Sequence, residues 1–214
     1  MKKEYPEESD PHYRYLKELQ SNRLKDTYAD YSEQDHYRAA TFFFFERLYS
    51  TKDTTDRDES FRSIYGTVKR FLGGEVAHSM SLLIELQEIT IEMDLEILDL
   101  LADLTPDYSM ETYERAYRDS HNYDLRVRQI ELLDITIRMV HRISHRFGIG
   151  LVLASLKSAC ILLGDTRMVD FLMDGYKAFA HIKDIEPLAQ AITKRETDRL
   201  DRIYEISAPT ISGS

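Results

Sequence analysis

Three polar side chains interrupt the apolar surface of the longest helical pattern in the sequence. Gln87, Thr90 and Asp94 lie on one side of a helix expected over residues 75–103, each about a turn from the next. A carboxylate buried there without partners costs free energy or shifts its pKa, so Asp94 should face a Lys, Arg or Tyr side chain, a backbone N–H or a metal ion. Two hypotheses stay open for this cluster: a structural hydrogen-bond network that fixes helix register, or the polar floor of a ligand or metal pocket.

Asp134, His141 and His145 form a second candidate site, at positions i, i+7 and i+11 of one expected helix. Two histidines four residues apart can share a metal ion, and a carboxylate two turns away could add a ligand. Three ligands from one helix are uncommon, however, and arginines lie nearby on the same helix. The sequence therefore favours a polar cluster at the edge of the apolar face over a metal site.

Carboxylates near a run of four phenylalanines could supply a di-iron site, with Glu46 as the best single candidate because it follows the run directly. Such sites in helical bundles combine Glu residues from two helices with Glu-x-x-His motifs from two others, and our interpretation assigns no Glu-x-x-His motif to this chain. A salt bridge or helix-cap contact is the simpler role for Glu46. The carboxylates that could serve as ligands of such a site are Glu46, Asp53, Asp56, Asp58 and Asp94.

The commonest catalytic and nucleotide-binding motifs are absent from the sequence. It contains no Gly-x-Ser-x-Gly, P-loop, dinucleotide-binding glycine pattern, Cys-x-x-Cys or His-Glu-x-x-His. Hydrolases, nucleotide binders and zinc proteases of these types therefore have no motif support.

The element that must position these side chains is the helix expected over residues 75–103, which no Gly or Pro interrupts. On a helical wheel its acidic residues fall on one narrow arc, and Leu, Ile and Met cover most of the rest. A helix that is apolar over most of its circumference belongs in the middle of a bundle. Only the acidic arc should then meet solvent, namely Glu85, Glu88, Glu92, Glu96, Asp99 and Asp103.

Helical periodicity continues through the rest of the chain, and no stretch shows the alternation of a strand. We predict an all-α, single-domain bundle of about eight or nine helices around the long helix. Length and helix count add an analogy to haem-oxygenase-like architecture. The domain should span residues 10–206, between a flexible N-terminus (1–9) and a flexible tail (207–214). The other helices are expected near residues 11–31, 36–49, 58–72, 110–118, 124–147, 151–163, 166–182 and 184–206.

Four consecutive phenylalanines, Phe42 to Phe45, occupy the helix expected over residues 36–49. Side chains at four successive positions point to all sides of a helical turn. Either the turn is buried within the monomer, or one side meets another subunit in a homodimer. Phe42 and Phe45, with Glu46 beside them, are therefore candidates for contact with an apolar ligand or a partner.

A second aromatic expectation concerns the helix over residues 124–147, whose inward face should include Phe147. Gly148 is well placed as the left-handed residue that ends this helix.

Composition restricts the classes of partner. A formal net charge of −10 argues against binding to nucleic acid or to anionic lipid. The N-terminus has no apolar signal core, and no apolar run reaches membrane-spanning length. Cys160 is the only cysteine and lies in an apolar segment, which is typical of a buried small side chain rather than a disulfide or metal ligand. We expect a cytoplasmic protein that binds neither nucleic acid nor membrane.

The segment from Thr41 to Tyr49, Thr-Phe-Phe-Phe-Phe-Glu-Arg-Leu-Tyr, followed by Asp53 and by Asp-Arg-Asp at residues 56–58, resembles the bacterial FFLEELY-motif proteins. Flanking features are similar over most of the chain, among them Ala116-Tyr117-Arg118. Arg47 departs from the motif. The resemblance implies a one-domain helical fold and carries no established activity.

We expect a non-enzymatic helical protein that binds a partner protein or an apolar small molecule, because aromatic residues gather around Phe42–Phe45 without a recognisable catalytic set. The alternative is an oxidase-like helical enzyme that uses a metal or haem among Glu46, Asp94, His141 and His145.

Overall fold

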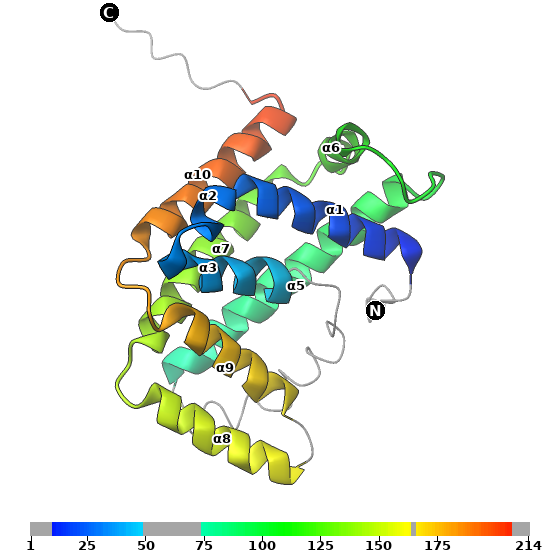
Figure 1. The fold of residues 1–214 in the computed structure, drawn as a ribbon. Coiled ribbons are helices and arrows are strands. Elements are labelled where there is room, and N and C mark those ends of the chain that lie inside the picture. The colour runs from blue at the N-terminus through cyan, green and yellow to red at the C-terminus, as the bar shows by residue number, and fades with distance from the viewer. Residues whose placement is uncertain (1–9, 49–73, 164–165, 207–214) are drawn as a thin grey trace, which may run out of the picture.

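The computed structural model describes residues 10–48, 74–163 and 166–206 (Figure 1). Within these ranges the chain forms nine α-helices and one π-helical segment, with no strand. The predicted all-α, single-domain bundle is confirmed. The helix expected over residues 58–72 and both expected flexible ends lie outside the described residues.

The N-terminal part of the bundle consists of α1 (Pro11–Thr27), α2 (Ala29–Ser32) and α3 (Asp35–Phe42). The Asp10 carboxylate caps α1 by accepting the backbone N–H of His12 at 2.8 Å. The single helix expected over residues 11–31 is broken at Tyr28, whose fully buried ring lies at the junction of α1 and α2. After α3 the chain continues as a π-helical segment, Phe43–Leu48, whose turns are wider than those of the regular α-helix that was expected here.

The remaining helices lie within a few residues of their predicted bounds. They are α5 (Gly74–Leu100), α6 (Met110–Asp119), α7 (Tyr123–Ser144), α8 (Ile149–Leu163), α9 (Arg167–Phe179) and α10 (Glu186–Ile203). Gly148 does have a left-handed backbone, with φ +79°, but it does not end α7 as predicted, because the C-cap of α7 is His145 and Gly148 directly precedes α8. Phe147 was wrongly assigned to the core, because α7 ends at Ser144 and its helical register does not extend to Phe147, which is fully exposed.

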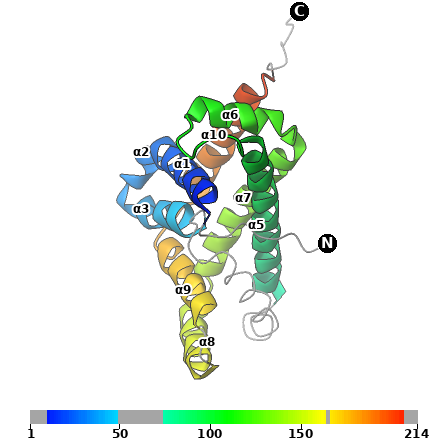
Figure 2. The same ribbon diagram turned by 90° about the vertical axis from the view of Figure 1, so that its right-hand side faces the viewer.

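The centre of the described bundle is α7 rather than the longest helix, α5. α7 packs extensively against α5, α9 and α10 and also touches α8, whereas the main neighbours of α5 in the described ranges are α1, α6 and α7. Figure 2 shows α5 along one side of the molecule, with α7 next to it. Leu100, the last residue of α5, belongs to the apolar surface that was expected to be buried, but it is 50% exposed at the end of the helix.

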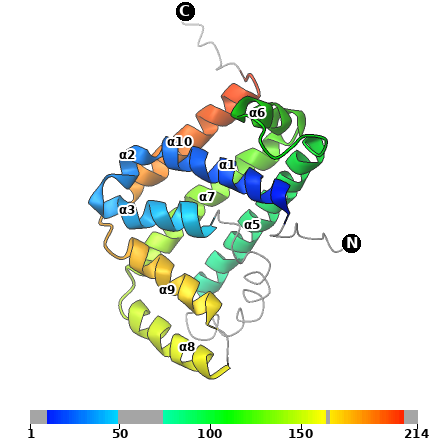
Figure 3. The ribbon, with the colours of Figure 1, turned by 45° about the vertical axis from the view of Figure 1, so that its right-hand side comes forward.

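The interior divides into two apolar clusters. The first, here called the Phe core, lies among α3, the π-helical segment, α7, α8, α9 and the start of α10, and contains Phe43, Phe44, Phe45, Phe171 and Phe179. The second, here called the Tyr core, lies among α1, the ends of α5 and α10, α6 and the start of α7, and contains Tyr108, Tyr113 and Tyr117. Figure 3 shows α9 between α3 and α8 at the Phe-core end of the molecule. None of the helices in the described ranges is long and apolar enough to cross a membrane.

Candidate functional site

Asp94 is buried to 1% exposure at the contact of α5 with α1. Its carboxylate accepts a hydrogen bond from Lys17 Nζ at 3.0 Å and another from Gln20 Nε2 at 2.7 Å. The expected cationic partner is therefore Lys17, which is itself buried. An ion pair shielded from solvent on both sides fixes the position of α1 on α5.

Thr90, one turn before Asp94, belongs to a different contact. Its hydroxyl donates to the Leu86 carbonyl at 2.8 Å and accepts from Gln129 Nε2 of α7 at 2.7 Å. Gln87 is half-buried on the same helix. The hydrogen bonds of Thr90 and Asp94 thus lead to two different helices, and their proposed role as one ligand-binding floor stays a prediction.

Charge and burial act in opposite directions on Lys17. Burial alone would lower its pKa, but the charge of Asp94 and the hydrogen bond to it outweigh this, so the pKa of Lys17 is raised. Burial raises the pKa of Tyr117 to about 12. The Arg126 guanidinium lies 3.7 Å from the centre of the Tyr117 ring, a favourable cation–π geometry. These two contacts suit a structural role. Not every polar atom around the Tyr core is paired, however: within the described residues, the buried atoms without a hydrogen-bond partner are Gln20 Oε1, the Tyr108 hydroxyl and Arg126 Nη2.

The candidate metal-binding residues, Asp134, His141 and His145, form hydrogen bonds within α7 or with residues later in the chain. Asp134 accepts from Arg138 Nε at 2.9 Å and from the Thr193 hydroxyl at 3.2 Å. His141 Nε2 lies 2.8 Å from the Ile182 carbonyl, and His145 Nδ1 lies 2.9 Å from the His141 carbonyl. In the part of the chain that the structure describes, no group of three or more His, Cys, Asp or Glu side chains is arranged to hold a metal ion.

Two Glu-x-x-His sequences were missed at the sequence level, Glu33 to His36 and Glu75 to His78. Glu33 and His36 are exposed at the connection of α2 and α3, and His78 is exposed near the start of α5. The side chains of Glu75 and Glu46 lie outside the described residues. The oxidase-like alternative stays a prediction, and the positions of these residues do not add support to it.

The phenylalanine run is buried at three positions and open at one. Phe43, Phe44 and Phe45 are each at most 5% exposed, whereas Phe42 is 64% exposed. Phe45 stacks on Tyr28 with ring centres 5.3 Å apart, and Phe44 meets Phe179 edge to face at 5.8 Å. Phe42 is thus the one ring of the run that a ligand or partner can reach directly.

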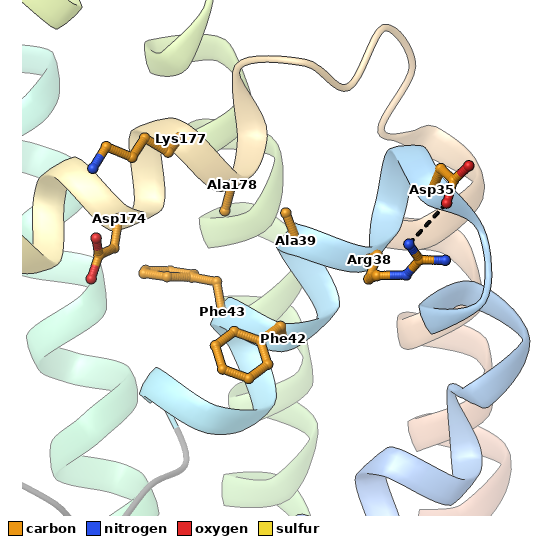
Figure 4. A pocket seen from close by; sticks show the side chains of 8 residues that line it. All are labelled: Asp35, Arg38, Ala39, Phe42, Phe43, Asp174, Lys177 and Ala178. Carbon is orange, nitrogen blue, oxygen red and sulfur yellow. Dashed lines mark ion pairs between the residues drawn. The ribbon is translucent and has the colours of Figure 1, made fainter.

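Phe42 stands beside an open cleft between α3 and α9 with a volume of about 710 Å³ (Figure 4). Ala39 and Ala178 face each other across it from the two helices, and Phe43 points into the space between them. The side chains that line the cleft are Asp35, Arg38, Ala39, Phe42, Phe43, Asp174, Lys177 and Ala178.

The floor of the cleft depends on Gly175 of α9. A Cβ atom at this position would lie 3.1 Å from Phe43 Cζ, which is closer than ordinary side-chain packing allows. The missing side chain therefore lets the Phe43 ring approach the backbone of α9. There the ring packs against Phe171 at 5.2 Å and meets Phe179 edge to face at 6.2 Å.

The cleft has charged groups at both ends. At one end Arg38 forms an ion pair with Asp35 at 2.9 Å, and at the other end lie Asp174 and Lys177 of α9. Two positive and two negative side chains thus flank an apolar middle. Such a site can hold an apolar body while hydrogen-bonding polar groups at its ends.

The sequence predicted a binding role for Phe42 and Phe45 but did not predict the cleft. Ala39, Asp174, Lys177 and Ala178 are ordinary residues of amphipathic helices, and only their meeting across α3 and α9 makes them lining residues. No sequence signal links the two helices, because they lie far apart in the chain.

Comparison with known proteins gives a family but no activity. A family model described as "Domain of unknown function (DUF8198)" matches residues 2–209. No curated protein and no solved structure matches the chain. The resemblance to FFLEELY-motif proteins and the haem-oxygenase-like architecture accordingly stay predictions.

Proposed function

The chain belongs to the family described as "Domain of unknown function (DUF8198)", and we propose that it is a non-enzymatic binding protein whose α3–α9 cleft holds a small amphipathic molecule. The observation that carries this proposal is the open cleft itself, in which the exposed Phe42 and the buried Phe43 line an apolar middle between charged ends. A single exposed ring beside a buried aromatic cluster supplies contact area without any need to open the core.

The size of the cleft supports a small-molecule ligand. Its volume of about 710 Å³ falls within the range of roughly 300–1,000 Å³ that is typical of small-molecule sites. Lining Ala and Phe side chains favour an apolar body, and Lys177 at one end favours a ligand with an acidic or hydrogen-bonding group. Arg38 at the other end already binds Asp35 and the backbone carbonyls of Ser32 and Glu33.

The local backbone also supports a binding role. The π-helical segment Phe43–Leu48 begins at the residue that forms the floor of the cleft. Short π-helical segments occur often at functional sites, because the extra residue per turn redirects the side chains that follow.

Filling the cleft tests the proposal. Ala39 is exposed on α3 and faces the cleft, so Ala39→Trp should occupy the apolar middle without disturbing the core. The probe is 1-anilinonaphthalene-8-sulfonate, an aromatic body with one anionic group, titrated by its fluorescence. We expect wild-type protein to bind the probe and Ala39→Trp to weaken its affinity by about tenfold or more.

Ala29→Trp is the matched control, since Ala29 is exposed on α2 and does not line the cleft. The wild-type chain has no tryptophan, so the emission of each variant reports on a single introduced ring. Blue-shifted emission is expected only for Ala39→Trp. Equal probe affinity in wild type and both variants would refute the cleft as the binding site.

A homodimer through the Phe42–Phe45 region is the second candidate, favoured by the 64% exposure of Phe42. Phe42→Glu should then abolish self-association in sedimentation velocity while leaving the melting temperature unchanged. A dimer that survives this substitution excludes the Phe42 contact.

We also propose a cytoplasmic location, which cell fractionation tests.

A further inference from the structure

α8 (Ile149–Leu163) is apolar on two opposite faces. Its inward stripe of Ile149, Leu153, Leu156 and Cys160 is buried against the bundle. The outward stripe lies one or two residues further along, on the roughly opposite side of the helix, where an ordinary surface helix is charged or polar. Here it consists of Leu151, Ala154, Ser158 and Ile161, all exposed.

The largest outward side chains are well exposed. Leu151 is 75% and Ile161 58% exposed, and the fully exposed Phe147 lies in the turn just before the helix. Figure 1 shows α8 at the edge of the molecule, beside α9. An apolar stripe of this kind on an outer helix indicates an interaction surface.

The serines on this side of α8 do not make it polar. Ser155 Oγ donates to the Leu151 carbonyl at 2.9 Å, and Ser158 Oγ donates to the Ala154 carbonyl at 3.1 Å. Each hydroxyl is therefore satisfied within the helix and can enter an apolar contact at little cost. The small side chains at the middle of the stripe also allow the backbone of a second helix to come close.

The distribution of charge favours α8 as the contact between two copies of the chain. Each copy of the chain carries a net charge of −10, so two copies repel wherever their acidic surfaces meet. Among the described helices α8 is the only one without an Asp or Glu residue. Its single charge, Lys157, is paired with Asp170 of α9 at 2.6 Å. α8 is thus the helix through which two copies can meet with the least repulsion.

The order of side chains along the stripe is self-complementary. The spacing of three, four and three residues is that of a coiled-coil seam. Consider two copies of α8 that run antiparallel, with the twofold axis crossing the outward face at the level of Leu156. Leu151 of each copy then lies opposite Ile161 of the other. Ala154 then lies opposite Ser158, so large side chains meet at the ends and small ones in the middle.

We propose that α8 pairs antiparallel with α8 of a second copy of this chain, through the stripe from Leu151 to Ile161. A helix of 15 residues is about 22 Å long, so the contact is smaller than a standard interface of about 800 Å² per partner. The dimer should therefore dissociate on dilution. This surface is separate from the α3–α9 cleft, and its failure would leave the proposed ligand site unaffected.

Sedimentation velocity across about 1–300 µM protein tests the pairing. Wild-type protein should shift from monomer to dimer with concentration, and Leu151→Glu should weaken the association by about tenfold or more. Leu100→Glu is the matched control, because Leu100 is an exposed leucine at the end of α5. Circular dichroism melting checks that both variants fold. A monomer throughout, or a dimer lost in Phe42→Glu but kept in Leu151→Glu, overturns the proposal.

Disulfide trapping tests the antiparallel register. Ala154→Cys and Ser158→Cys are made separately in a Cys160→Ala background, which removes the buried native thiol. Mixing the two variants should give cross-linked dimer several times faster than either variant alone. Faster cross-linking of each variant with itself indicates a parallel pair and contradicts the proposed register.

Discussion

The Tyr core and the Phe core use opposite means to hold the helices together. Around the Tyr core, buried polar groups meet in directional pairs, above all Lys17 with Asp94 and Arg126 with the Tyr117 ring. The Phe core combines phenylalanine rings with aliphatic side chains, and the buried polar side chains among the same helices are neutral, such as Thr41 and Ser144. From this difference we expect the half around the Tyr core to be the more rigid one, and the half that includes the cleft to be the more adaptable.

The physical reason lies in the cost of movement. Displacing α1 from α5 would leave the charges of Lys17 and Asp94 apart in an apolar environment, which is expensive. Sliding one phenylalanine over another exchanges contacts of similar energy. A ligand can therefore be accommodated at the Phe core at a lower cost than at the Tyr core.

Asp94→Ala should have the largest effect on stability. It leaves the Lys17 ammonium buried without its carboxylate, so the free energy of unfolding should fall by about 3–5 kcal/mol. Urea denaturation measures this, with Asp99→Ala on the exposed side of the same helix as the control. A loss below about 1 kcal/mol would place Asp94 outside the structural network.

Replacing both members of the ion pair sharpens the comparison. Lys17→Met combined with Asp94→Leu removes both charges and keeps apolar volume, so about half or more of the loss in Asp94→Ala should be recovered. Denaturation of the single and double variants completes the cycle. A double variant as unstable as Asp94→Ala would mean that Lys17 is not the cause of the loss.

Alkaline pH should weaken the Tyr core. The raised pKa of Lys17 means that the folded state keeps its proton above the unfolded value of about 10.4. Tyr117 ionises near pH 10 in an unfolded chain and near 12 when folded, because burial raises its pKa. Both contributions are complete below about pH 10 and are lost as the pH rises through the folded pKa values.

Urea denaturation between about pH 8 and 11.5 checks this prediction. Tyr117→Phe removes one of the titrating groups, so it should flatten the decline. A free energy of unfolding that stays constant, or rises, across this window contradicts the assignment of these groups to a buried network.

Gly175→Ala should change stability little but disturb the cleft. Alanine in a helix interior is favoured over glycine by about 1 kcal/mol, whereas its Cβ would press on Phe43 at a similar cost. The net change in the free energy of unfolding should therefore lie within about 1 kcal/mol, while probe affinity changes. Unchanged probe affinity would show that Phe43 does not form the floor of the site.

Phe42→Ala should have the smallest effect on stability, within about 0.5 kcal/mol, because the ring is largely exposed. Probe affinity should nevertheless fall, because the ring lines the cleft. Parallel denaturation and fluorescence titration separate the two effects. A large loss of stability would instead identify Phe42 as a core residue.

The sequence predicted the helices better than their arrangement. Helical periodicity and capping residues such as Asp10 are local signals, and so is the need of Asp94 for a buried partner. The central position of α7 was not predictable, because a helical wheel shows how apolar a helix is and not which neighbours cover it. Phe147 was misplaced for a local reason: a regular pattern does not show where the helix actually ends.

The cleft lay beyond the sequence for a different reason. Phe42 and Phe45 were predicted as binding residues because they belong to an unusual run of phenylalanines. In the structure Phe42 is exposed and Phe45 is buried. The π-helical turn that follows α3 sets this division, and Gly175 of a distant helix admits the Phe43 ring. Both features depend on tertiary contacts.

Hydrogen exchange measured by mass spectrometry, with and without saturating 1-anilinonaphthalene-8-sulfonate, tests the division into a structural and a binding half most directly. We expect the probe to slow exchange in α3, the π-helical segment and α9, and to leave α1 and α6 around Lys17 and Asp94 unchanged. Slower exchange confined to α1, α5 and α6 would contradict the account, because it would place the ligand at the buried ion pair.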